Sequence, residues 1–336
     1  MFAATVTSFI TAANTKQKNI SHDTRRLRLI SGTSNPALSK EIAQYIGIPC
    51  VPLVSKRFAD GELYIQIQQS IRGCDVFLIQ PTCAPVNDSL MELMIMVDAC
   101  KRASARQITA VIPYYGYARA DRKTAGRESI TAKLTANLLV SSGVDRVLAM
   151  DLHSAQIQGY FDIPCDHIYG SPVLVDYLAT KQLDEVVVVS PDVGGVARAR
   201  AFAKQMKDAP LAIIDKRRSA HNVAESLTVI GEVANKTAIL IDDMIDTGGT
   251  ICAGAELLRK EGAKRVFACA SHAVFSPPAY SRLSIPNLFE QVIVTNSIPV
   301  PNDLNFEQLQ VLSVANMLGE AILRIHEESS VSSMFR

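Results

Sequence analysis

Short runs rich in valine and isoleucine alternate with amphipathic stretches over most of this chain, and that alternation limits the fold more than any other feature. The amphipathic stretches include "NDSLMELMIMVDACKRASA", "ITAKLTANLLVSSG" and "TICAGAELLRKEGA", the last with Gly262 as a helix stop. Strands separated by helices indicate βαβ units and a mostly parallel sheet covered on both faces. The predicted strands are Leu27–Ser31, Val76–Gln80, Ile108–Pro113, Val147–Asp151, Val186–Ser190, Leu211–Asp215, Ala238–Ile241, Val266–Ser271 and Gln291–Thr295.

The alternation continues too long for one sheet, so the sequence predicts two tandem doubly wound α/β domains that divide near Tyr169–Pro172. The domains are expected over residues 25–169 and 170–315, with a C-terminal helix and tail over residues 316–336. Residues 1–24 are expected to be a disordered tail. An organelle transit peptide remains an alternative there, because the first 20 residues carry Ser and Thr but no acid.

The composition is that of a soluble globular protein, with 336 residues, 48% of them hydrophobic, and a formal net charge of +1. Such a balance argues against a nucleic-acid-binding protein, and no apolar run reaches the roughly 18 residues of a membrane span. The seven cysteines are scattered without a CxxC pair, which favours reduced thiols and a cytoplasmic location.

Polar motifs follow several of the predicted strands directly. They are "DLHSAQIQG", "SPDVGG", "DKRRSAHN" and "DDMIDTGGT". Ligands of parallel α/β sheets lie beyond the carboxyl ends of the strands, so these motifs are expected to share one rim.

The motif "DTGGT" has the residue types of a phosphate-binding turn. Glycines let backbone amides approach an anion, and the following helix N-terminus adds partial positive charge. The residues expected to hold the phosphate are Asp246, Thr247, Gly248, Gly249 and Thr250, while Asp242 and Asp243 are expected to accept hydrogen bonds from a vicinal diol. Together these groups predict a ribose 5-phosphate site. A plain helix N-cap beside solvated acids is the alternative, whereas a Walker B strand is disfavoured because no GxxxxGK[ST] motif is present.

Several motifs together resemble one enzyme family. "ILIDDMIDTGGT" is similar to the phosphoribosyl-binding signature of type I phosphoribosyltransferases and of ribose-phosphate pyrophosphokinases. "RFADGE", "VIPYYGYARADRK", "MDLHSAQIQGYF" and "VVSPDVGG" favour the pyrophosphokinases, and the resemblance runs from Leu27 to Phe335. It implies two phosphoribosyltransferase-like domains and transfer of the β,γ-pyrophosphoryl group of ATP to the 1-hydroxyl of ribose 5-phosphate.

The same resemblance implies roles for individual residues. His153 and Asp192 would bind Mg²⁺, with His153 partly a nucleotide contact, since histidine is an unusual magnesium ligand. Lys216 and Arg218 would belong to a mobile catalytic loop. The residues implied at ATP are Phe58, Asp60, Glu62 and Arg119, the first three on a hairpin that reaches a neighbouring subunit. Many relatives carry glutamine where Ala120 stands here, so this chain lacks a side-chain amide that the resemblance would place at the nucleotide.

Regulation and assembly are also implied by the family. Class I members are activated by phosphate and inhibited by ADP at an anion site between subunits of a homo-oligomer, a hexamer built from dimers. The matching positions are Ser70, Arg72, Arg127, Ser330 and Ser332. Two rival functions are a PRPP-using phosphoribosyltransferase, which needs only one such domain, and a non-catalytic regulatory subunit, which tends to have a disrupted catalytic loop.

Overall fold

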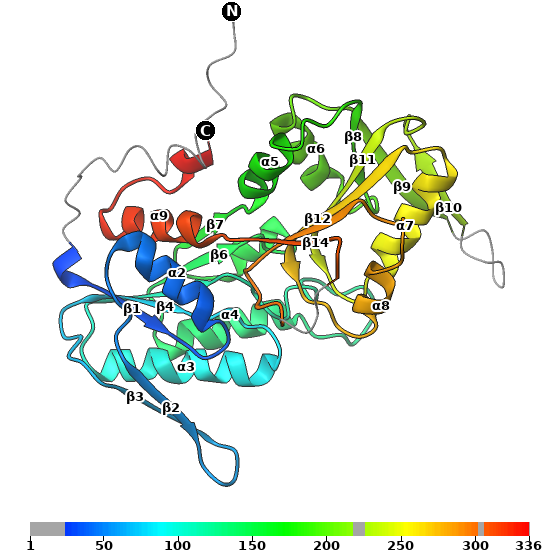
Figure 1. Cartoon of the computed structure of the whole chain (residues 1–336). Coiled ribbons are helices and arrows are strands. Elements are labelled where there is room, and N and C mark those ends of the chain that lie inside the picture. Colours follow the sequence, from blue (N-terminus) through cyan, green and yellow to red (C-terminus); the bar gives the residue numbers. More distant parts are fainter. Residues whose placement is uncertain (1–23, 218–225, 302–305, 336) are drawn as a thin grey trace, which may run out of the picture.

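The computed structural model describes residues 24–217, 226–301 and 306–335, in which two mostly parallel sheets each carry helices on both faces (Figure 1). The predicted α/β fold is therefore confirmed. Apart from Thr24, which begins a short 3₁₀ helix, the predicted N-terminal tail lies outside these residues. All seven cysteines are free thiols. No helix within the described ranges is both long and apolar enough to cross a membrane.

The first sheet contains five parallel strands in the order β1-β4-β5-β6-β7. Their bounds are β1 Leu27–Ser31, β4 Asp75–Ile79, β5 Gln107–Ile112, β6 Arg146–Met150 and β7 Cys165–Ile168. Helices α3 (Val86–Arg102) and α4 (Thr131–Ser142) cover one face. Helix α2 (Pro36–Ile46) covers the other, beginning at the side-chain cap of Asn35 and ending at Gly47, whose φ of 83° favours glycine.

A two-stranded hairpin, β2 (Leu53–Arg57) and β3 (Leu63–Ile67), leaves the first sheet between β1 and β4. It projects away from both sheets as a separate arm (Figure 1). Its root packs against the α3 side of the core through Leu53, Ile65 and Ile67, while Phe58 at its turn is 51% exposed.

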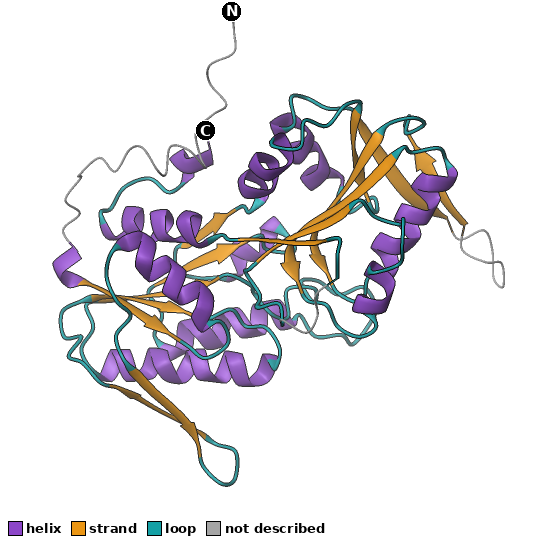
Figure 2. Ribbon diagram, viewed as in Figure 1, coloured by secondary structure: helices purple, strands orange, loops and turns teal. Residues whose placement is uncertain are grey.

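The second sheet has seven strands in the order β10-β9-β8-β11-β12-β13-β14, and only β10 runs antiparallel to its neighbour. The strands are β8 Val186–Ser190, β9 Leu211–Arg217, β10 Ser226–Ile230, β11 Thr237–Ile245, β12 Arg265–Ala273, β13 Gln291–Thr295 and β14 Leu309–Leu312. Helices α5 (Ser171–Ala179) and α6 (Val196–Gln205) pack on one face. Helices α7 (Gly249–Lys260) and α8 (Ala279–Leu283) pack on the other (Figure 2).

The last helix, α9 (Ala315–His326), returns to the first half of the molecule. Its buried Leu318 and Ile322 join the core formed by α2 and the first sheet, including Leu38 and Ile42. The chain therefore completes the first half only after it has finished the second sheet.

Two of the predicted strand ends that were wrong lie next to the site. Strand β11 continues past Ile241 to Ile245, because β12 is long enough to pair with it, with Asp242 opposite Ala270. Strand β9 continues past Asp215 to Arg217, because the unpredicted strand β10 pairs with it, with Lys216 opposite Leu227. Both acids of the "DD" pair and Lys216 thus lie in strands and not in the loops that follow them.

Candidate functional site

The site lies where the order of the second sheet reverses. From β8 the chain moves outward to β9, and it then returns to β11 on the opposite side of β8. Crevices at such switch points are the usual ligand sites of open α/β sheets. Asp192 follows β8, and Asp242 and Asp243 lie near the carboxyl end of β11, so the predicted acids flank the switch point.

Asp243 is 1% exposed, and its charge is paired. The Arg198 guanidinium Nη1 lies 3.0 Å from Asp243 Oδ1 and 3.0 Å from Asp242 Oδ1, and His153 Nδ1 lies 2.9 Å from Asp243 Oδ2. Arg198 Nη2 also donates to the His153 carbonyl at 3.2 Å. A buried carboxylate needs such partners, because desolvation of an unpaired charge is costly. The acids are therefore not the solvated pair of the alternative interpretation.

The two neighbouring carboxyl groups differ in their affinity for protons. Burial raises the pKa of Asp242, and the adjacent charge of Asp243 raises it further. Burial also acts to raise the pKa of Asp243, but the hydrogen bond with His153 and the charge of Arg198 outweigh it and hold that pKa well below its usual range. The hydrogen bond to Asp243 in turn raises the pKa of His153. Asp243 is thus the charged anchor of this cluster.

Arg198 was missed by the sequence interpretation. It lies in the first turn of α6, directly after "SPDVGG", but "RARAFAKQ" also fits an exposed helix face. Its one local signal is its position at the start of a helix that begins on the rim.

The turn after β11 leaves backbone donors free for an anion. Gly248 is the N-cap of α7 with a φ of 74°, and no side chain caps the helix. Arg282 from α8 donates to the Thr247 carbonyl at 3.0 Å, and a Cβ on Gly249 would lie 3.3 Å from Arg282 Nη1. Uncapped amides, a positive helix end and a nearby guanidinium are the features of a phosphate site. Arg282 is a second residue that the sequence interpretation missed.

Arg119 reaches this rim from the first half of the chain. It follows β5, and its Nη1 donates to Asp246 Oδ2 at 2.5 Å. Burial acts to raise the pKa of Asp246, but hydrogen bonds from Ser276 and Arg119 hold it below its usual range. The structure therefore brings Arg119, predicted at ATP, together with Asp246, predicted at the sugar phosphate.

Among the described residues, the other predicted side chains have no hydrogen bond or ion pair with this cluster. Asp192 is exposed, and its Oδ1 accepts from the Gly195 amide at 2.8 Å. Phe58, Asp60 and Glu62 lie at the tip of the projecting arm (Figure 1). Arg218 lies outside the described residues.

The five residues predicted for an anion effector come from three segments of the chain, the loops before β4 and α4 and the tail after α9. Arg72 donates to Ser104 Oγ at 3.2 Å, whereas Ser330 and Ser332 bond each other at 3.1 Å near the C-terminus. Arg127 adopts a φ of 65° in an exposed loop. Among the described residues, no hydrogen bond or ion pair joins Ser70, Arg72 or Arg127 to the C-terminal serines.

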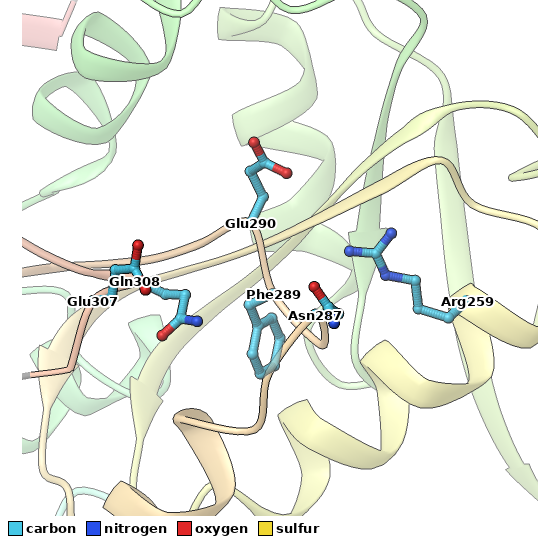
Figure 3. Close-up of a pocket in the computed structure, with 6 residues that line it drawn as sticks. All are labelled: Arg259, Asn287, Phe289, Glu290, Glu307 and Gln308. Carbon is cyan, nitrogen blue, oxygen red and sulfur yellow. The ribbon is translucent and has the colours of Figure 1, made fainter.

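A separate pocket of about 510 Å³ lies at the opposite edge of the second sheet (Figure 3). It is lined by Arg259, Asn287, Phe289, Glu290, Glu307 and Gln308, which lie near the amino ends of β13 and β14. Arg259 donates to the Lys264 and Leu288 carbonyls, and Glu290 pairs with Arg265. Two of its charged groups, Arg259 and Glu290, already have partners in the protein, and the pocket lies away from the rim acids.

Comparisons with known proteins agree on one family. A family profile described as the N-terminal domain of ribose phosphate pyrophosphokinase matches residues 27–143, and a phosphoribosyl synthetase-associated domain matches residues 217–336. The ribose-phosphate pyrophosphokinase of Prochlorococcus marinus is 86% identical over 327 residues, which cover 97% of this chain and 100% of that protein. That of Synechococcus elongatus is 75% identical over 314 residues, covering 94% of this chain and 95% of that protein.

A solved structure is similar across nearly the whole chain. The crystal structure of phosphoribosylpyrophosphate synthetase from Mycobacterium smegmatis matches with a TM-score of 0.86 and 44% identity. The match covers 90% of this chain and 100% of that one. The chain therefore belongs to the ribose-phosphate pyrophosphokinase family.

Proposed function

We propose that this chain is a ribose-phosphate diphosphokinase, which transfers the β,γ-pyrophosphoryl group of ATP to the 1-hydroxyl of ribose 5-phosphate and releases PRPP and AMP. Its relatives at 70–86% identity are named for this activity. The observation that carries the proposal is the paired acid cluster of Asp242 and Asp243 beside the uncapped turn before α7. PRPP made in this way would supply nucleotide, histidine and tryptophan biosynthesis.

Ribose 5-phosphate would bind with its phosphate at the turn and its hydroxyls at Asp242. The predicted phosphate ligands are Asp246, Thr247, Gly248, Gly249 and Thr250, of which Thr247 and Thr250 are exposed. Asp242 Oδ1 faces Arg198, and its side chain is 27% exposed, so it can accept from a sugar hydroxyl. Both oxygens of Asp243 are engaged by Arg198 and His153 and the residue is 1% exposed, so neighbouring groups must shift before Asp243 can contact the diol.

ATP would bind at the same rim, beside the bound ribose 5-phosphate. The 1-hydroxyl oxygen forms a bond to the β-phosphorus and gives up its proton to solvent, while the bond between that phosphorus and the bridging oxygen to the α-phosphate breaks. Negative charge therefore grows on the departing AMP. Arg119, Lys216 and Arg218 would stabilise that charge, as positioned cations do in phosphoryl transfer.

Magnesium fits the residues present at this rim. Mg²⁺ is usually held by one or two carboxylates together with waters and substrate phosphates. Within the described ranges, no group of three or more His, Cys, Asp or Glu side chains could hold an ion alone. Asp192 Oδ2 and His153 Nε2 are the groups left for such a shared site, and the metal would neutralise phosphate charge there.

Assembly and regulation extend the same proposal. The ATP residues Phe58, Asp60 and Glu62 lie on an arm that points away from the rim of their own chain, which supports a homo-oligomer in which the arm serves a neighbouring subunit (Figure 1). We propose a hexamer in the cytoplasm, regulated by phosphate and ADP at Ser70, Arg72, Arg127, Ser330 and Ser332. Among the described residues no hydrogen bond or ion pair links Ser70, Arg72 or Arg127 to the C-terminal serines, so we expect contact between subunits to complete the effector site.

The reaction itself tests the proposal. Purified protein incubated with ATP, ribose 5-phosphate and MgCl₂ is expected to form AMP and PRPP in equal amounts. Omission of ribose 5-phosphate should abolish AMP release. Formation of ADP, or ATP hydrolysis without PRPP, would contradict the assignment, and loss of all turnover would favour the regulatory-subunit alternative.

A further inference from the structure

A buried carboxylate in α3 gathers four hydrogen bonds from three segments of the chain. Glu92 is 2% exposed. Its Oε2 accepts from the Thr33 amide at 3.2 Å, from Thr33 Oγ1 at 2.7 Å and from Gln80 Nε2 at 2.6 Å, while its Oε1 accepts from Ser55 Oγ at 3.0 Å. Burial of a carboxylate in this way demands that its acceptor positions be filled, so the four donors fix the side chain firmly.

Three of the four donors belong to the rim of the first sheet, which is filled by its own side chains. Gln80 is fully buried, and its Oε1 accepts from the amide and the hydroxyl of Ser34. A Cβ on Gly32 would lie 2.1 Å from Gln80 Oε1, so the loop after β1 closes directly over this amide. The first rim therefore holds a closed polar network where the second rim holds an open turn.

The fourth donor, Ser55, lies in strand β2 of the projecting arm. In the part of the chain that the structure describes, it is the one link from this network to the arm, because Thr33 and Gln80 follow β1 and β4. One turn earlier in α3, Asp88 forms a second link, with its Oδ2 2.9 Å from Arg57 Nη2. Both partners of that outer pair are 47% exposed, so water screens it, whereas the Ser55–Glu92 bond is shielded.

We propose that Glu92 is a positioning residue for ATP: through Ser55 it fixes the direction of the arm that presents Phe58, without touching the nucleotide. The inference rests on the proposed role of the arm in ATP binding. Among the described residues, the arm is joined to α3 by the apolar contacts of its root, by the exposed Arg57–Asp88 pair and by the shielded Ser55–Glu92 bond, so loss of that bond is expected to loosen the turn that carries Phe58. An ordered arm also spares ATP the entropic cost of ordering it on binding.

The matched variants Ser55→Ala and Ser34→Ala separate this role from general stability. Each removes one serine hydroxyl from the same network, but only Ser55 belongs to the arm. Ser55→Ala is expected to raise the KM for ATP roughly 3- to 10-fold, as for the loss of about one hydrogen bond, and to leave the KM for ribose 5-phosphate unchanged. Ser34→Ala is expected to change neither KM. An equal rise with both variants would overturn the inference.

A fluorescent reporter measures the arm without relying on catalysis. The chain contains no tryptophan, so Phe58→Trp introduces a single one at the turn of the arm. In that background Ser55→Ala is expected to lower the tryptophan anisotropy, and Ser34→Ala is expected to leave it unchanged. Unchanged anisotropy in the Ser55 variant would overturn the inference, whatever the kinetic result.

A third variant separates failure of this inference from failure of the proposed function. Phe58→Ala should raise the KM for ATP if the arm binds the nucleotide. If Phe58→Ala has that effect and Ser55→Ala has none, the positioning role is wrong and the role of the arm stands. If neither variant changes the KM for ATP while PRPP still forms, both the role of the arm in ATP binding and the positioning role are wrong. The proposed enzymatic activity would still stand.

Discussion

Lys216→Ala is expected to lower kcat by roughly 100- to 1,000-fold, the usual cost of losing one well-placed donor to transition-state charge. The KM for ribose 5-phosphate should change far less, because that substrate is bound mainly by the turn after β11 and by Asp242. The fall in kcat is expected because Lys216 lies near the end of β9, on the same edge of the second sheet as the turn. Steady-state kinetics with each substrate varied in turn would measure both constants.

Lys260→Ala is the matched control for that prediction. Lys260 is exposed at the far end of α7, twelve residues along the helix that begins at the turn. Its removal should leave kcat unchanged. If Lys216→Ala raised only the KM for ribose 5-phosphate, a transition-state role for this lysine would be contradicted.

Arg198→Met is expected to lower the free energy of unfolding by about 3 kcal/mol, near the lower end of the range for breaking a buried ion pair. The cause is Asp243, which is 1% exposed and would keep only His153 as a partner, while the arginine side chain itself is 27% exposed. Denaturant unfolding followed by circular dichroism would measure the change. Catalytic activity should fall with it, because Arg198 also holds Asp242 and the backbone of His153.

Two further variants control for this second prediction. Arg200→Met changes an exposed arginine two positions later on the same helix, about half a turn around it, and should shift stability by no more than about 0.5 kcal/mol. The double variant Arg198→Met/Asp243→Asn should lose less free energy of unfolding than the sum of the losses in the two single variants. The reason is that the double variant no longer has an unpaired carboxylate at position 243. Equal stability of the Arg198 and Arg200 variants would contradict the pairing.

The sheets could be predicted from local pattern because each buried parallel strand is a nearly continuous apolar run. All nine predicted strands are present, three of them with identical bounds. Within the two large sheets, strands β7, β10 and β14 were missed, since "CDHI", "SLTVI" and "LQVL" are short and mix polar with apolar residues. Their place is set by pairing with neighbouring strands and not by their own composition.

The rim acids could be predicted, but their partners could not. Asp242 and Asp243 stand out because charge follows an apolar run, and the question they raise is what pairs with them. The answer, Arg198 and His153, depends on contacts 45 and 90 residues away along the chain. No local pattern distinguishes Arg198 from the exposed Arg200 two positions later. The packing of α9 on the first sheet is likewise a long-range contact without a sequence signal.

The most direct measurement is a crystal structure of the protein with ribose 5-phosphate and a non-hydrolysable ATP analogue. We expect the sugar phosphate to accept hydrogen bonds from the backbone amides between Thr247 and Thr250, with a ribose hydroxyl on Asp242. Ribose 5-phosphate found away from β11, with that turn holding no phosphate and Asp242 facing only solvent, would contradict the account.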